Sequence, residues 1–199
     1  MARRSAHSPE ELRQRILEAA QGIIERDGLV GLSAREIARA IGYSPGTLYN
    51  IFENLDDLLL TLQTHMLAEL VEVLRAVPEE KTPEESIDAL SRAYLDFALE
   101  NKLMWNLLFT HSMPAQMRAP TALVDNVNKV SELVEKPIGQ ILKTGSKQEV
   151  ELAAKALWAG VHGVTAIAVT EKGPTLNPAT ALVFVKQLVS TYTRGLTSK

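Results

Sequence analysis

Residues 33–52, SAREIARAIGYSPGTLYNIF, restrict the fold and function of this chain more than any other stretch. Ser33 and Glu36 have capping-box spacing, so the sequence predicts a helix that starts at Ser33. Gly42 can adopt the positive φ that ends a helix, and Ser44 followed by proline marks a second start. Two short helices joined by a tight turn are typical of a helix-turn-helix.

The second helix of this pair predicts a polar surface suited to a DNA major groove. Leu48 and Phe52 lie four residues apart, so both are expected on its buried side. Asn50 is of the type that pairs with adenine through two hydrogen bonds, while Thr47 and Tyr49 suit phosphate oxygens or a thymine methyl group. The expected DNA contacts are Arg3, Arg4, Ser33, Arg35, Tyr43, Ser44, Pro45, Gly46, Thr47, Tyr49 and Asn50. The alternative is a packing unit that binds nothing, because short helix pairs joined at glycine are common in all-α proteins.

Composition narrows the class of protein. The chain has 199 residues, enough for a sizeable core, and its lack of cysteine excludes disulfides and thiolate metal sites. A net charge of −3 argues against a general nucleic-acid binder and favours a small, specific site. The start lacks the apolar segment of a signal peptide, and the longest apolar run, residues 158–169, is too short to span a membrane. We therefore expect a cytoplasmic protein with no membrane partner.

Helix-start signals recur along the whole chain, and no segment alternates with the period of a strand. The sequence predicts an all-α fold of about nine helices. After the helix-turn-helix, the expected helices cover roughly residues 55–77, 83–100, 102–111, 121–143, 147–171 and 178–195. We expect a helix-turn-helix domain at residues 1–53 and a ligand-binding and dimerisation domain at residues 54–199. The helix that starts near Asn54 either transmits a tilt between them or is a simple rigid connector.

Residues 13–58 resemble the DNA-binding domain of TetR-family transcriptional regulators. The resemblance is carried by residues 16–20, Gly28, residues 33–38, residues 42–49, Phe52 and Leu58. It implies a homodimer that binds a near-palindromic double-stranded DNA operator, and a C-terminal ligand pocket whose occupancy lowers DNA affinity. Two positions depart from the family pattern, because Ile51 and Leu55 stand where the family often has a phosphate-binding histidine and lysine. Tyr43 also replaces the usual smaller aliphatic residue.

In the C-terminal part, residues 156–163 resemble a TetR subgroup marked by tryptophan, histidine and glycine in the penultimate helix. Trp158 and His162 lie four residues apart and share a helix face. No second metal ligand stands at suitable spacing, so we expect His162 to be a hydrogen-bonded core residue or, as a second possibility, to line a pocket. Soft and aromatic side chains are usually core but also line adaptable pockets. The expected ligand contacts are Tyr94, Phe97, Met104, Trp105, Phe109, Met113, Trp158 and His162.

Small residues of the 147–171 helix and an apolar stripe of the 178–195 helix favour a four-helix homodimer interface, although intramolecular packing would explain the same residues. The sequence predicts a repressor released from a palindromic operator by a small, mostly hydrophobic ligand. One alternative is a helical interaction or ligand-binding module without specific DNA binding. A helical enzyme is the other, but the sequence contains no phosphate-binding loop, metal cluster or catalytic set. We therefore expect no catalytic residue, no metal and no cofactor.

Overall fold

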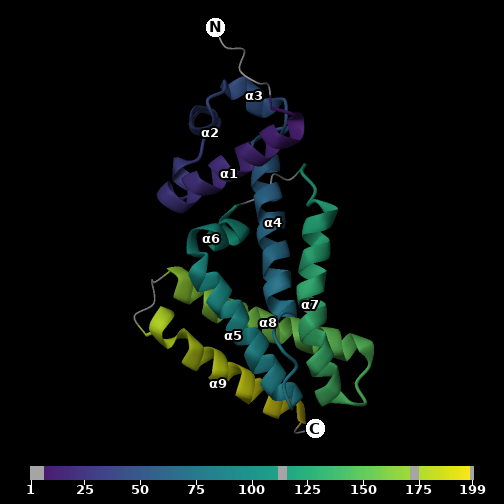
Figure 1. The fold of residues 1–199 in the computed structure, drawn as a ribbon. Coiled ribbons are helices and arrows are strands. Elements are labelled where there is room, and N and C mark those ends of the chain that lie inside the picture. Colours follow the sequence, from purple (N-terminus) through teal and green to yellow (C-terminus); the bar gives the residue numbers. More distant parts are fainter. Residues whose placement is uncertain (1–6, 112–115, 171–174, 198–199) are drawn as a thin grey trace. The chain divides into compact units, whose positions relative to one another are not determined.

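The computed structural model describes residues 7–111, 116–170 and 175–197, and within these ranges every regular element is a helix (Figure 1). The all-α prediction is confirmed. The helices are α1 (Pro9–Asp27), the short 3₁₀ helix η1 (Leu29–Gly31), α2 (Ala34–Ile41), α3 (Pro45–Tyr49), α4 (Leu55–Arg75), α5 (Pro83–Glu100), α6 (Lys102–Thr110), α7 (Thr121–Leu142), α8 (Lys147–Thr170) and α9 (Pro178–Thr197).

The chain divides into two compact units. The N-terminal unit contains Met1–His65 and Leu103–Pro120, and the C-terminal unit contains Met66–Lys102 and Thr121–Lys199. Helix α4 therefore contributes its first half to one unit and its second half to the other. The N-terminal unit is discontinuous in sequence, because it includes α6.

In the N-terminal unit, α1 packs against α2, and α2 packs against α3. Ile16, Ile37, Leu48 and Phe52 are almost completely buried there. The guanidinium carbon of Arg13 lies 4.4 Å from the centre of the Phe52 ring, a cation–π geometry. Packing from α1 thus fixes the hydrophobic side of the helix-turn-helix and leaves its polar side exposed.

Buried polar contacts join α6 to the first half of α4 within the N-terminal unit. Gln63 Nε2 donates to the backbone oxygen of Leu107 at 2.9 Å and lies 3.3 Å from His111 Nδ1. His111 Nε2 lies 2.8 Å from Asp56 Oδ1. These contacts satisfy polar groups that would otherwise be costly to bury.

The C-terminal unit is a bundle in which α5, α7, α8 and α9 pack against one another. Gly160 of α8 allows a close approach of α9, because a Cβ atom there would lie 2.9 Å from Leu188 Cδ2. By length and composition α8 could cross a membrane. Its buried residues, which include Leu157 and Val161, instead pack as the core of the bundle.

Helix starts largely follow the sequence signals. Full capping boxes form at α1, through Ser8 and Glu11, and at α5, through Thr82 and Glu85. At α2 the box is only half formed. The Ser33 hydroxyl accepts from the Glu36 N–H at 3.2 Å, but the Glu36 carboxylate pairs with Arg39 on the outside of the helix.

Two glycines of the N-terminal unit give a sharp test of these backbone constraints. Gly28 ends α1 at φ 71° and ψ −178°, a region that is nearly closed to other residues, whereas Gly22 lies exposed inside α1. We expect Gly28→Ala to lower the free energy of unfolding by about 1–3 kcal/mol. Gly22→Ala should raise it by about 0.5–1 kcal/mol, because alanine loses less backbone entropy in a helix. Urea unfolding measures both, and equal effects of the two variants would contradict the assignment.

Candidate functional site

The exposed side of the helix-turn-helix consists of the residues that the sequence predicts. Ser44, Pro45, Gly46, Tyr49 and Asn50 are exposed, and Tyr49 retains 52% of its accessible surface. Thr47 and Tyr43 are half-buried at the edge of this surface. Leu48 on the opposite side is 1% exposed, so packing determines which face α3 presents.

Helix α3 is shorter than the sequence pattern implies. It ends at Tyr49, and the chain then closes in a tight turn in which the N–H groups of Ile51 and Phe52 both reach the Leu48 carbonyl, at 3.0 and 2.9 Å. Asn50 caps this end with its backbone still in the right-handed helical region. The amide of Asn50 is therefore presented from a turn and not from the interior of a helix.

Ser44 is the N-cap residue of α3, as its position before proline predicts, but within the described residues its side chain makes no capping hydrogen bond. Its hydroxyl oxygen lies instead 3.2 Å from Thr47 Oγ1, and the Ser44 carbonyl accepts from the Thr47 N–H at 3.0 Å. The two hydroxyls orient each other on the exposed side of the turn.

Tyr43 is held by a contact that the sequence does not reveal. Its hydroxyl lies 2.7 Å from His7 Nδ1, and Arg15 Nη1 lies 2.5 Å from His7 Nε2. Because a guanidinium can only donate, Nε2 must accept, which leaves the His7 proton on Nδ1 to be donated to Tyr43. His7 therefore links Tyr43 to Arg15 of α1 in this arrangement.

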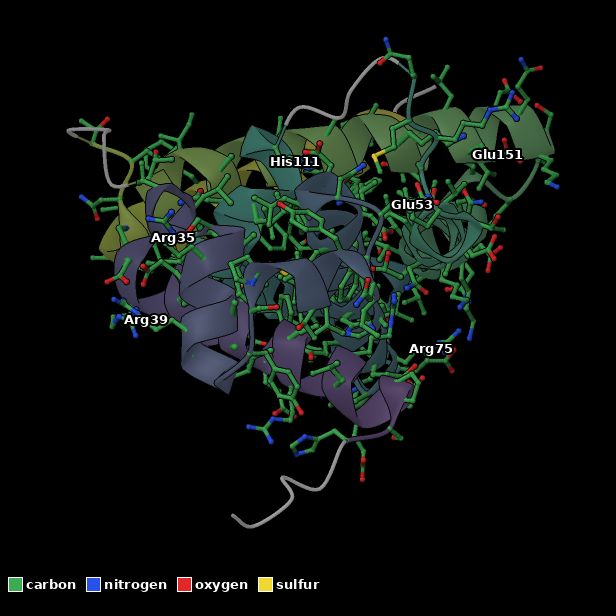
Figure 2. All side chains as sticks on the ribbon, turned by 90° about the horizontal axis from the view of Figure 1, so that it is seen from above. Arg35, Arg39, Glu53, Arg75, His111 and Glu151 are labelled. Carbon is green, nitrogen blue, oxygen red and sulfur yellow. The ribbon has the colours of Figure 1, made fainter. Side chains whose placement is uncertain are left out.

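Arginines flank the turn on α2. Arg35 and Arg39 both project from this helix (Figure 2), and both are exposed. Arg39 is paired with Glu36, whereas no ion pair is seen for Arg35 among the described residues. Arg3 and Arg4 lie outside the described residues.

The start of α4 has no basic anchor. Ile51 and Leu55, the positions that depart from the family pattern, are half-buried. Asn54 Oδ1 accepts from the Asp57 N–H at 2.9 Å, and Asp57 Oδ2 accepts from the Glu53 N–H at 3.1 Å. Two backbone donors that could face a phosphate at this helix start are therefore occupied by the chain's own side chains.

In the C-terminal unit, the structure brings together three of the residues predicted to bind a ligand. The Tyr94 hydroxyl lies 3.1 Å from His162 Nδ1, and the Tyr94 ring meets the Trp158 and His162 rings edge to face at 6.5 and 6.4 Å. We call Tyr94, Trp158 and His162 the aromatic cluster. This geometry agrees with the expectation of a hydrogen-bonded His162.

The other predicted ligand contacts are not assembled with this cluster. Phe97 is buried on α5, while Met104 and Trp105 are buried residues of α6 and belong to the N-terminal unit. The side chain of Phe109, and Met113 as a whole, lie outside the described residues.

The aromatic cluster borders a cavity of about 20 Å³. Tyr94, Trp158 and Ser91 line it, together with aliphatic side chains from α4, α5, α7 and α8. Burial raises the pKa of Tyr94 and lowers the pKa of His162, so both groups are neutral near pH 7. The Trp158 indole N–H partly offsets the rise at Tyr94.

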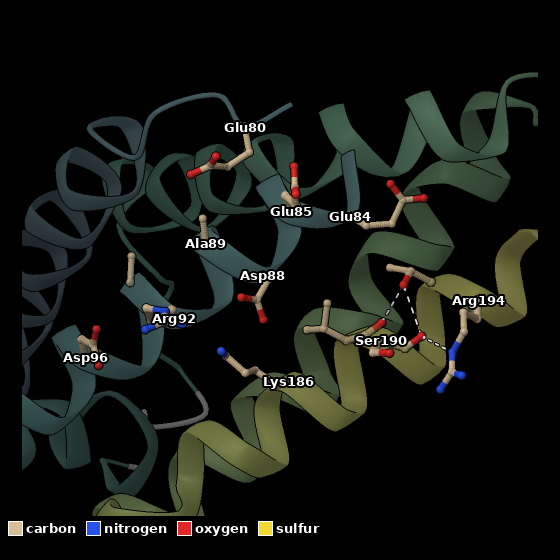
Figure 3. A pocket seen from close by; sticks show the side chains of 13 residues that line it. Glu80, Glu84, Glu85, Asp88, Ala89, Arg92, Asp96, Lys186, Ser190 and Arg194 are labelled. Carbon is tan, nitrogen blue, oxygen red and sulfur yellow. Dashed lines mark hydrogen bonds between the residues drawn. The ribbon is translucent and has the colours of Figure 1, made fainter. Parts of the chain in front are cut away.

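A second concave region of the C-terminal unit lies between α5 and α9. It is a surface groove of about 820 Å³, and charged side chains line it (Figure 3). Asp88, Arg92 and Asp96 project from α5, and Lys186 and Arg194 from α9. Because charges of both signs face solvent there, the groove does not suit a mostly hydrophobic ligand.

The outer side of α8 carries an uncovered apolar stripe. Leu152 is 69% and Ile167 is 47% exposed, and the small residues Ala156, Ala159 and Gly163 continue the stripe at helical spacing. We call these five residues the α8 stripe. A Cβ atom at Gly163 would meet no described atom within 4 Å, so packing within the chain does not require glycine there.

Helix α9 also leaves apolar side chains uncovered. Val185 and Val189 are buried within the C-terminal unit, because they face α5 and α8. Val183 and Phe184 are the exposed apolar residues instead, at 67% and 41%.

The lowered pKa of His162 predicts a loss of stability in acid. The unfolded chain binds a proton near pH 6.5, whereas the folded chain resists protonation at this ring because the charge would be desolvated. The free energy of unfolding should have its full value above this pH and should decline as the pH falls below it. His162→Asn, which keeps a polar atom near Nδ1, should show a smaller decline in urea unfolding between pH 7.5 and 5. Parallel profiles of the two proteins would contradict the assignment.

Family models match both parts of the chain. Residues 16–62 match the model described as bacterial regulatory proteins of the tetR family, and residues 87–191 match the tetracyclin repressor-like C-terminal domain.

Two curated relatives are transcriptional regulators. The regulator BetI of Brucella anthropi is 30% identical over 112 residues, which cover 54% of this chain and 58% of that protein. The uncharacterized regulator YobS of Bacillus subtilis is 28% identical over 86 residues, which cover 43% of this chain and 45% of that protein. The chain thus spans about half the length of the curated relatives that it matches.

Solved structures share the fold. A protein of unknown function from Rhodococcus sp. RHA1 matches with a TM-score of 0.74 and 23% identity, over 99% of this chain and 100% of that one. The TetR-family regulator PfmR of Thermus thermophilus matches with a TM-score of 0.61 and 19% identity, over 88% and 97%. One family model covers the helix-turn-helix, and the other covers more than half of the chain. This protein therefore belongs to the TetR family of bacterial regulators.

Proposed function

We propose that this protein is a dimeric DNA-binding transcriptional regulator, a repressor released from a palindromic operator by a small, mostly hydrophobic ligand. The observation that carries the proposal is the exposed polar face of α3 and its turn, held outward by buried Leu48 and Phe52. Membership in the TetR family supports the same reading. We propose no enzymatic activity, and we propose the cytoplasm as the location.

In this proposal, Asn50 and Thr47 contact base edges, and Tyr49 contacts the backbone or a thymine methyl group. Arg35, Ser33 and the arm with Arg3 and Arg4 provide phosphate contacts. The start of α4 is not expected to contribute, because its amides are already capped and Leu55 carries no charge.

The proposed dimer uses α8 and α9. A self-complementary interface forms when the α8 stripe of one subunit packs against the same stripe of its partner, with Val183 and Phe184 of α9 beside it. Small residues such as Ala159 and Gly163 permit close approach of the two α8 backbones, and Leu152 and Ile167 supply the apolar area.

The effector is proposed to act through α4. Leu74 of α4 lines the cavity next to the aromatic cluster, and the same uninterrupted helix carries Asp56 and Gln63 in the N-terminal unit. A ligand that enlarges the cavity has to displace Leu74, so it favours a different state of α4. It lowers DNA affinity only if it binds that state more tightly than the DNA-bound state.

DNA binding is tested with DNA that flanks the protein's own gene. We expect salt-sensitive, sequence-selective binding, with half-site centres about 34–36 Å apart or a multiple of this distance. Asn50→Ala should weaken selective binding by about 1–3 kcal/mol, since one bidentate base contact is lost. Tyr49→Ala should abolish it. Asn128→Ala, at an exposed position of α7, is the matched control and should bind as the wild type does.

Two outcomes of this experiment would count against the proposal. Undiminished binding in both Asn50→Ala and Tyr49→Ala would contradict the assigned recognition surface. Binding with no preference for any sequence would favour the alternative of an interaction or ligand-binding module without specific DNA recognition.

The dimer interface is tested by charge insertion. Ala159→Glu should convert the dimer to a monomer, because two carboxylates would face each other in an apolar contact. Ala122→Glu, an exposed position in the first turn of α7, is the control and should leave the dimer intact. Analytical ultracentrifugation measures both, and a dimer that survives Ala159→Glu would exclude the α8 stripe as its centre.

A further inference from the structure

The cavity next to the aromatic cluster is small. Its volume of about 20 Å³ accommodates roughly one water molecule, whereas ligand pockets are usually of several hundred Å³. Leu74, Ile87, Val130 and Leu157 are almost completely buried in its wall. An occupant has to part these side chains, so most of its surface must be apolar.

One polar atom at this cavity points to the chemistry of the occupant. The indole Nε1 of Trp158 is buried. Its N–H acts on the Tyr94 hydroxyl, but among the described residues it makes no hydrogen bond of normal geometry. Indole N–H is a donor only, and a buried donor without a well-formed hydrogen bond is unfavourable. The group that would satisfy it is a hydrogen-bond acceptor.

The surroundings select an uncharged acceptor. Tyr94 and Ser91 are the other polar residues that line the cavity, and the remaining lining side chains are aliphatic. Burial keeps Tyr94 and its hydrogen-bonded neighbour His162 neutral. A carboxylate or an ammonium group would therefore lose its hydration here without meeting an opposite charge.

From this geometry we infer that the cavity receives a neutral, mostly aliphatic molecule with a single carbonyl-type acceptor, as in a ketone, ester or lactone, and that the Trp158 indole N–H donates to this acceptor. Tyr94, oriented by His162, forms the adjoining wall and positions the indole through their edge-to-face contact. The inference rests on the proposed effector function and specifies the class of its ligand.

The test uses four probes with the same ten-carbon chain and the full-length protein without DNA. The probes are 2-decanone, decane, decanoate and decylamine. The chain contains two tryptophans, so a ¹⁵N-indole NMR spectrum contains one signal for Trp158 and one for Trp105 as an internal control. We expect 2-decanone to raise Tm and to move the Trp158 indole signal downfield. Decane should bind more weakly without the downfield shift, and the two charged probes should bind least.

Trp158→Phe tests the hydrogen bond separately from the aromatic packing. It retains an aromatic ring but removes the N–H, so the affinity for 2-decanone should fall by about tenfold, to that for decane. Trp105→Phe is the matched control and should keep the preference for 2-decanone. Circular dichroism establishes that both variants fold.

The outcomes separate this inference from the proposed function. Equal or tighter binding of decane, decanoate or decylamine, an unchanged preference in Trp158→Phe, or no binding of any probe would overturn the inference. Binding of 2-decanone as expected but no release of operator DNA would uphold the ligand class and contradict the effector mechanism. Loss of selective DNA binding alone would leave the ligand class unaffected.

Discussion

Helix α4 has to bury apolar side chains in two separate hydrophobic cores with one uninterrupted run of residues. Its first half buries Leu58 and Leu62 in the N-terminal unit, and its second half buries Leu70 and Leu74 in the C-terminal unit. A helix that is apolar on most sides cannot remain exposed, so both units must supply covering helices. The course of the chain after α4 follows from this requirement.

The chain meets the requirement by returning to the N-terminal unit through α6. Polar contacts of Gln63 and Asp56 with the Leu107 carbonyl and His111 secure α6 against the first half of α4. The sequence predicts that residues 54–199 form a second domain, since the helix-turn-helix pattern ends before them. It gives no basis for assigning α6 to the first unit, because these contacts join residues 44 and 55 positions apart and no local motif encodes them.

Local physics explains why most helices could be predicted from the sequence. Local signals act over only a few residues, so they can be recognised from the sequence alone. Examples are the caps Ser8 and Thr82 and the positive-φ glycines Gly28 and Gly42. Where another local contact competes for the same side chain, the capping prediction is less complete. Glu36 pairs with Arg39 instead of completing its capping box.

The candidate sites divide in the same way. The exposed face of α3 follows from helical spacing. Trp158 and His162 lie on the same helix face because they are four residues apart. The side-chain contact between His7 and Tyr43 joins residues 36 positions apart, and the contact between Tyr94 and His162 joins residues 68 positions apart. Such pairings arise from how helices pack together, so the sequence could indicate the residue types but not their partners. Met104 and Trp105 are grouped with Tyr94 by residue type alone, whereas contacts place them in the N-terminal unit.

The small volume of the cavity at the aromatic cluster has a kinetic consequence. With room for about one water molecule, the closed state offers no vacant space to a ligand that arrives by diffusion. Entry would wait for Leu74 and its neighbours to withdraw, so the observed association rate would level off at the rate of opening as ligand concentration rises. The time that such a regulator needs to respond would then be set by the packing of its own core and not by the abundance of its effector.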